Sequence, residues 1–150
     1  MQKLINLLFF LLITNISATN LVPESYWDIQ SVSNPKINSS GDSIIFSKRH
    51  IDKLNDSFES EIWIMSANGS GKRFFAKGSN PKWSNDGLRV AFLKADDNEI
   101  SQIYVKSISN ESETKITNSS KIISDFAWSK DDSLFAFSSF NEYEDEWAIE

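Results

Sequence analysis

A short apolar strand, a polar turn and a second apolar strand follow one another three times along this chain. The three copies occupy residues 35–47, 81–93 and 126–138. When they are aligned on Ile37, Trp83 and Trp128, successive copies are 46 and 45 residues apart. A constant period of this length indicates a repeated supersecondary unit rather than three unrelated hairpins.

The turn of each copy carries residues that favour tight reversals. The middle copy has Asn-Asp-Gly at 85–87 and the first has Ser-Gly-Asp at 40–42. Glycine supplies a positive φ without a Cβ clash, and Asp bonds nearby backbone groups. The third copy has Lys-Asp-Asp at 130–132 and no glycine. We therefore expect this third turn to be more strained or of another type.

The second strand of each copy is apolar at consecutive positions, as in Val-Ala-Phe-Leu at 90–93. Such a run is typical of a strand that is buried on both faces of its sheet. We expect Ala91 and Ala136 to lie where neighbouring sheets approach closely. Phe92 and Phe137 would then fill the opposite face.

A third strand is predicted at 61–66 and 102–107, with its counterpart around Trp147, and a polar fourth strand at 72–75 and 114–117. Four antiparallel strands repeated every 45 residues are the signature of β-propeller blades. The predicted fold is therefore all-β: a partial β-propeller of about three four-stranded blades, the third incomplete, after an N-terminal signal peptide.

The predicted organisation has three parts: a signal peptide at 1–18, a lead-in segment at 19–34 and an incomplete propeller at 35–150. The blades are placed at about 35–78, 79–120 and 121–150. Closed propellers usually have four to eight blades, so these residues are too few to close a ring. We expect the chain to be the N-terminal piece of a longer protein that supplies the remaining blades.

The N-terminus has the three features of an export signal. A basic start at 1–3 precedes an apolar stretch at 4–13 and the small residue Ala18. The apolar stretch is shorter than the roughly 20 residues of a transmembrane helix, so no stable membrane anchor is expected. The predicted location is periplasmic or secreted. The chain has no cysteine, which excludes a lipoprotein anchor and leaves packing to stabilise the fold.

Composition and motifs exclude several functions. The formal net charge is −6 without a large basic cluster, which disfavours nucleic-acid binding. No complete Gly-x-Ser-x-Gly elbow occurs, so no serine nucleophile is assigned. His50 is the single histidine, and we interpret it as a surface residue beside a charged loop. No catalytic, cofactor or metal site is predicted.

Two acidic clusters and four aromatic residues are interpreted structurally. The clusters at 96–99 and 142–146 have oxygen ligands that calcium accepts, but their spacing matches no defined loop, so solvated hairpin tips are expected. A role of such carboxylates at the central opening, holding a peptide amino terminus, stays open. The aromatic residues are assigned to the core between blades: Trp63, Trp83, Tyr104 and Trp128.

Specific phrases of the chain resemble a known family. These are Pro-Glu-Ser-Tyr-Trp-Asp-Ile at 23–29, Val-Ser-Asn-Pro-Lys-Ile at 32–37, Glu-Ile-Trp-Ile-Met-Ser-Ala-Asn-Gly-Ser-Gly at 61–71 and Asp-Phe-Ala-Trp-Ser at 125–129. They are similar to the N-terminal propeller of bacterial prolyl oligopeptidase family serine peptidases, of the dipeptidyl and acylaminoacyl peptidase types. The match covers nearly all residues after the signal, although the family's usual Ser-Pro-Asp-Gly turns lack their proline here.

The resemblance implies a partner domain and a substrate class. In that family a C-terminal α/β-hydrolase domain carries the catalytic Ser, Asp and His, and the propeller admits only short peptides. That domain is absent from these residues, so whether this chain is itself part of an enzyme stays open. Two alternatives remain: a TolB-like periplasmic propeller that binds other proteins, and an inactive truncated product. The short segment at 22–33 before the first repeat favours the peptidase.

Overall fold

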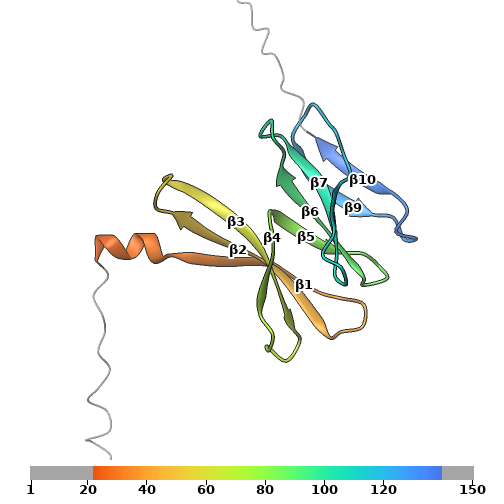
Figure 1. Ribbon diagram of the computed structural model, residues 1–150, viewed down its shortest axis with the longest axis horizontal. Helices are drawn as coiled ribbons and strands as arrows, with labels where there is room; N and C mark the ends of the chain where they lie inside the picture. The colour runs from red at the N-terminus through yellow and green to blue at the C-terminus, as the bar shows by residue number, and fades with distance from the viewer. Residues whose placement is uncertain (1–21, 140–150) are drawn as a thin grey trace, which may run out of the picture.

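The computed structural model describes residues 22–139, and its regular secondary structure is antiparallel strands apart from one short 3-10 helix (Figure 1). The first sheet has the order β1-β2-β3-β4, the second β5-β6-β7-β8, and the third β10-β9. The three sheets lie side by side in chain order and do not close into a ring, which confirms the predicted partial propeller. The strands are β1 (Gln30–Ile37), β2 (Ser43–Asp52), β3 (Ser57–Ser66), β4 (Arg73–Lys77), β5 (Ser79–Trp83), β6 (Arg89–Ala95), β7 (Ser101–Ser107), β8 (Glu113–Lys115), β9 (Ile123–Trp128) and β10 (Phe135–Ser139).

The three predicted hairpin turns share one backbone hydrogen-bond pattern. In the middle turn the Ser84 N–H donates to the Arg89 carbonyl (2.9 Å), and the Gly87 N–H donates to the Ser84 carbonyl (3.0 Å). The residue at the Gly87 position is left-handed in every copy, with φ of +79° at Gly41, +71° at Gly87 and +57° at Asp132. The glycine-free third turn is thus of the same type. The third turn is strained because Asp132, which is not a glycine, adopts a positive φ. The sequence had led us to expect a turn that was either more strained or of another type, and the first of these is observed.

The innermost strands begin earlier than the sequence pattern indicated. β1 starts at Gln30, inside the predicted lead-in segment, and its pairing with β2 shifts register between Ser33 and Lys36. The second sheet has the same irregularity between Ser79 and Lys82. An Asn at positive φ followed by Pro lies at both shifts, and Pro has no N–H to donate. In β1 the pairing with β2 is present on both sides of the bulge, so the strand extends back to Gln30 although the apolar pattern does not.

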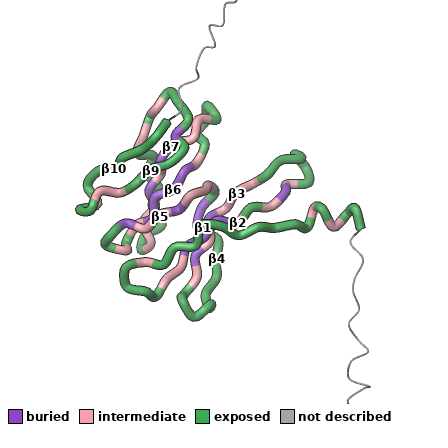
Figure 2. The backbone as a smooth tube through the Cα atoms, turned by 180° about the vertical axis from the view of Figure 1, so that it is seen from behind, coloured by how far each residue is buried: buried purple, intermediate pink, exposed green. Residues whose placement is uncertain are grey.

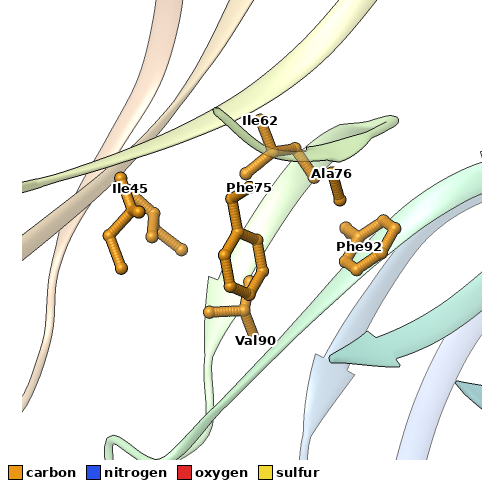
Figure 3. Close-up of a cluster of buried hydrophobic side chains, with 7 residues drawn as sticks. Ile45, Ile62, Phe75, Ala76, Val90 and Phe92 are labelled. Carbon is orange, nitrogen blue, oxygen red and sulfur yellow. The ribbon is translucent and has the colours of Figure 1, made fainter. Parts of the chain in front are cut away.

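Apolar side chains pack between adjacent sheets, and Figure 2 marks the buried positions in purple along the backbone. Between the first and second sheets, Phe75 and Phe92 are among a buried set that Figure 3 shows, together with Ile45, Ile62, Ala76 and Val90. Between the second and third sheets a second buried set is formed by Ala91, Leu93, Ile103, Val105, Ile123 and Phe126. Each sheet therefore contributes residues to its neighbour's core, as blades of a propeller do.

The central strand β6 is buried on both faces, as its apolar run predicted. Val90 and Phe92 face the first sheet, whereas Ala91 and Leu93 face the third. Ala91 and Phe92 are both 0% exposed. In β10, however, Ala136 is exposed and Phe137 is 49% exposed. β10 is an edge strand of the described structure, so its side chains lack the cover that β7 gives to β6.

The 3-10 helix η1 (Pro23–Asp28) precedes the first sheet and lies against β2. An ion pair of 3.4 Å between Asp28 and Lys53 joins the helix to the β2–β3 hairpin. In the described part of the chain, no helix has the length and apolar character needed to cross a bilayer. The predicted signal peptide lies outside the described residues.

Candidate functional site

The structure places His50 in β2 and the acidic cluster at 96–99 in the connection between β6 and β7. His50 lies near the end of β2, opposite Glu59 of β3, and its buried Nδ1 has no hydrogen-bond partner within residues 22–139. Asp96 accepts hydrogen bonds from the backbone N–H groups of Asn98 (3.0 Å) and Ile100 (3.2 Å), so it shapes its hairpin tip. The Lys115 ammonium, 2.5 Å from Asp96, lowers the pKa of that carboxyl.

The remaining acidic residues give no cation site in the described structure. Across residues 22–139, no three His, Asp or Glu side chains gather closely enough to hold a metal ion. The second acidic cluster, at 142–146, lies outside the described residues.

Three of the four aromatic residues assigned to the core lie against a buried set. Trp83 and Tyr104 pack on the core between the first two sheets, and Trp128 packs on the core between the second and third. The indole N–H of Trp83 donates to the Lys36 carbonyl (3.1 Å), and that of Trp128 donates to the Lys82 carbonyl (3.3 Å). These two tryptophans therefore repeat one contact between successive blades.

Trp63 differs, because it lies on the outer face of the first sheet. On this face Phe46 and Trp63 are opposite each other across β2 and β3, as are Ile44 and Met65. The face is hollowed into a groove of about 450 Å³. The groove is lined by Gln30, Val32, Pro35, Ile44, Phe46, Lys48, Trp63, Met65 and Lys72. We call this surface the open face of the first sheet.

Two ammonium groups lie over the indole of Trp63. The Nζ atoms of Lys48 and Lys72 are 5.1 Å and 5.8 Å from the ring centroid, within the range of cation–π attraction. The ring edge meets Phe74 at an interplanar angle of 87°, and the indole N–H donates to Glu61 (2.8 Å). Trp63 is thus held in place by these contacts where it lines the groove.

The chemistry of the open face suits binding rather than catalysis. Its lining has apolar side chains, one amide and two lysines, and it contains no nucleophile paired with a base. Val32 is 64% exposed, so apolar area remains for a partner to cover. Apolar side chains with carboxylates at their rim would match both the groove and its two ammonium groups.

Polar contacts between the second and third sheets were not foreseen from the sequence. The Lys82 ammonium donates to Asp125 (2.7 Å) and to the Phe126 carbonyl, and the Asn80 amide donates to the same Asp125 oxygen (2.9 Å). This ammonium holds the pKa of Asp125 down to about 2, with the Asn80 bond as the next contribution. Alignment of the repeats could have suggested this contact, because Asn80 and Asp125 are one repeat apart in the sequence.

A second polar link joins two of the hairpin turns. Asp132 accepts hydrogen bonds from the Asn85 amide (2.7 Å) and from the backbone N–H groups of Asn85 (2.8 Å) and Asp86 (3.0 Å). These bonds fix the residue that adopts positive φ in the third turn. The Asp that replaces glycine there therefore ties adjacent blades together.

Comparison with known proteins identifies a peptidase among the sequence relatives. No family model matches the chain. A Bacillus subtilis (strain 168) protein named uncharacterized peptidase YuxL is 28% identical over 107 residues. That match covers 69% of this chain but only 16% of the relative, so the chain spans a small part of the relative's length.

Solved structures share the fold. An acylaminoacyl peptidase from Pyrococcus horikoshii has a TM-score of 0.69 at 21% identity, covering 81% of this chain and 19% of that one. The β-propeller domain of the trilobed protease from Pyrococcus furiosus, described as having an open velcro topology, has a TM-score of 0.64 at 21% identity. The shares covered are 75% of this chain and 34% of that one.

TolB from Acinetobacter baumannii has the same fold, with a TM-score of 0.55 at 20% identity over 69% of this chain and 25% of that one. At sequence identities of 20–21%, these solved structures establish the fold of the chain but not its function. The Bacillus subtilis sequence relative is itself named a peptidase. The chain is therefore a series of β-propeller blades of the kind found in acylaminoacyl peptidases and TolB proteins, which confirms the resemblance inferred from the sequence.

Proposed function

We propose that this chain is the N-terminal propeller part of an exported serine peptidase of the prolyl oligopeptidase family. The catalytic α/β-hydrolase domain would lie in residues beyond this chain, and the propeller would limit access of substrates to it. The peptidase among the sequence relatives supports this proposal, as does the small share of each relative that the chain covers.

The observation that carries the gating role is the construction of the first blade. Its four strands come from one continuous segment, 30–77, so it borrows no strand from elsewhere. A ring that begins with such a blade closes by side-chain packing on the open face of the first sheet. A contact without shared backbone hydrogen bonds separates more readily than a continuous sheet. Substrate entry through this seam is the mechanism we propose.

The test uses the product of the complete reading frame. Val32→Asp places a carboxylate on the open face, where it would weaken packing of the last blade. Leu88→Asp is the matched control, since Leu88 lies in a turn and is 66% exposed against 64% for Val32. We expect Val32→Asp to raise cleavage of an unfolded peptide of about 30 residues several-fold relative to cleavage of a short aminoacyl chromogenic substrate, with Leu88→Asp unchanged.

Two results would reject different parts of the proposal. If the ratio of long-peptide to short-substrate cleavage were equal in the wild-type protein and both variants, the gating role would be rejected, but the peptidase proposal would stand. Absence of hydrolysis by the wild-type product would remove the peptidase, and a reading frame without a hydrolase domain would favour a TolB-like binding module. Export is tested by the mass of the secreted protein, which should lack residues 1–18.

A further inference from the structure

The turn that joins β3 to β4 carries an exposed Asn-Gly pair, Asn68 and Gly69. Two backbone bonds close the turn: the Ser66 N–H donates to the Ser70 carbonyl (2.9 Å), and the Gly69 N–H donates to the Ser66 carbonyl (2.9 Å). Gly69 has a φ of +86°, and apart from its chain neighbours no described residue places an atom within 4 Å of where a Cβ would lie. The Gly69 nitrogen therefore has no side chain beside it to shield it from an approaching group.

The side-chain carbonyl of Asn68 is polarised by two donors. Its Oδ1 accepts hydrogen bonds from the backbone N–H of Ser70 (2.9 Å) and from the Ser70 hydroxyl (2.7 Å). Donors aimed at a carbonyl oxygen stabilise the negative charge that develops there when a nucleophile adds to the carbon. The same bonds hold the carboxamide folded back toward the main chain that follows it. The turn thus places an activated carbon next to an unshielded backbone nitrogen.

We propose that Asn68 is a site of spontaneous modification, at which the asparagine becomes aspartate or isoaspartate through a cyclic succinimide. The Gly69 nitrogen gives its proton to solvent and bonds to Cγ of Asn68. The bond from Cγ to Nδ2 breaks, and Nδ2 takes a proton from solvent and leaves as ammonia. Water then opens the ring at Cγ to give aspartate, or at the backbone carbonyl carbon to give isoaspartate. The net reaction consumes one water, releases one ammonia and involves no oxidation or reduction.

The reacting nitrogen becomes available by local opening of the turn. In the closed turn the Gly69 N–H is bonded to the Ser66 carbonyl, which opposes loss of its proton. Exposed turns open at low free-energy cost without unfolding of the sheet. The inference concerns this turn alone and does not depend on a peptidase function.

The second sheet contains a natural comparison for this site. In the connection from β7 to β8, Oδ1 of the exposed Asn110 accepts hydrogen bonds from the Ser112 backbone N–H (3.1 Å) and hydroxyl (2.9 Å). The residue that follows is Glu111, also at positive φ (+56°), and its carboxylate pairs with Arg73 (2.9 Å). The two asparagines therefore share the same two donors and differ in the side chain on the attacking residue.

The isoaspartate product would alter the first sheet. Its main chain runs through the former side-chain carbon, so the turn gains one backbone atom between Ser66 and Ser70. The two bonds that close the turn do not fit the longer path. We expect the β3–β4 hairpin, in which Trp63 lies opposite Phe74, to lose its tight connection.

The test is incubation of the 150-residue chain at mildly alkaline pH, which favours loss of the amide proton. Tandem mass spectrometry of proteolytic peptides measures conversion at Asn68 and Asn110 in the same sample, and labelling by an isoaspartyl methyltransferase identifies the isoaspartate. The matched variant is Glu111→Gly, which gives Asn110 an unshielded neighbour and which the backbone tolerates because glycine adopts a positive φ freely.

We expect Asn68 to convert at least about tenfold faster than Asn110, a difference of about 1.4 kcal/mol in activation free energy. Glu111→Gly should raise the rate at Asn110 toward that of Asn68. Equal rates at the two sites of the wild-type chain would overturn the proposal, as would an Asn110 rate that Glu111→Gly leaves unchanged. Conversion of Asn68 in urea but not in the folded chain would also overturn it, because the folded turn would then protect the asparagine.

Discussion

Asp125 joins the second and third sheets through bonds to two side chains. Its carboxylate accepts from the Lys82 ammonium at 2.7 Å and from the Asn80 amide at 2.9 Å. The Asp125 side chain is 63% exposed, so solvent screens much of this attraction. We expect Asp125→Asn to lower the free energy of unfolding by about 0.5–1 kcal/mol at pH 7, in the range of partly exposed pairs. Urea denaturation measures it.

The same carboxylate predicts a pH dependence. Its pKa falls from 3.8 in the unfolded chain to about 2 in the folded protein. A depressed folded pKa stabilises the protein above the unfolded value, and that contribution is lost as pH falls through the folded value. The wild-type protein should therefore lose its advantage over Asp125→Asn between about pH 4 and pH 2. Glu24→Gln, on the exposed helix η1, is the control, and a constant difference over this range would contradict the account.

Trp83 shows the limit of an assignment to the core. It packs on the buried set between the first two sheets, yet it is only half-buried. Trp83→Ala should destabilise the chain by about 3 kcal/mol, the lower part of the usual range for emptying a large aromatic site. Trp83→Phe, which keeps a ring but loses the bond to the Lys36 carbonyl, should cost less. A loss below about 0.5 kcal/mol for Trp83→Ala would mean that the indole contributes little to the contact between blades.

At the scale of elements, Gly78 is the single residue between β4 of the first sheet and β5 of the second, and it lies close to the backbone of β6. Its φ is +140°, and an added Cβ would lie 2.5 Å from the Leu93 carbonyl oxygen and 2.9 Å from the Phe92 ring. Gly69 has φ of +86° with no atom within 4 Å of an added Cβ. Gly69→Ala carries the backbone cost of a left-handed conformation, about 1–2 kcal/mol. Gly78→Ala also places a side chain at a φ that L residues rarely adopt, and it adds a clash with backbone that cannot move freely. The midpoint temperature of thermal unfolding should therefore fall further for Gly78→Ala than for Gly69→Ala. An equal decrease in the two variants would contradict this.

The hairpins were predictable from the sequence because their signals are local. The paired apolar strands and the turns at 40–42 and 85–87 are set by neighbouring residues and repeat at a constant period. The early start of β1 was not predictable, since its pairing resumes beyond a bulge that the apolar pattern cannot reveal. The ten-residue lengths of β2 and β3 were also missed, because their outer halves carry charged residues such as Arg49 and Glu59.

The contacts between elements were predictable only in part. Consecutive apolar residues correctly placed β6 between two sheets. The different surroundings of Trp63 and Trp83 depend on whether a neighbouring blade covers them, and a single strand's sequence does not carry that information. The link between Asp132 and the turn at 85–87 joins residues about one repeat apart, which alignment of the copies could have suggested.

For the whole molecule, the proposed function assigns catalysis to a domain beyond these residues. The chain has one histidine, His50, and it is not among the residues that line the open face of the first sheet. We expect residues 19–150 expressed alone to release no chromophore from aminoacyl or dipeptidyl substrates. Hydrolysis above a buffer blank that survives repurification and is lost in a His50→Gln variant would overturn this expectation.

The most direct test of the peptidase proposal is the intact mass of the native protein together with labelling by a fluorophosphonate, which reacts with activated serines. The account predicts a labelled product several times heavier than the 17.1 kDa of this chain. An unlabelled product of 17.1 kDa or less would contradict it and leave a set of propeller blades that acts, if at all, by binding.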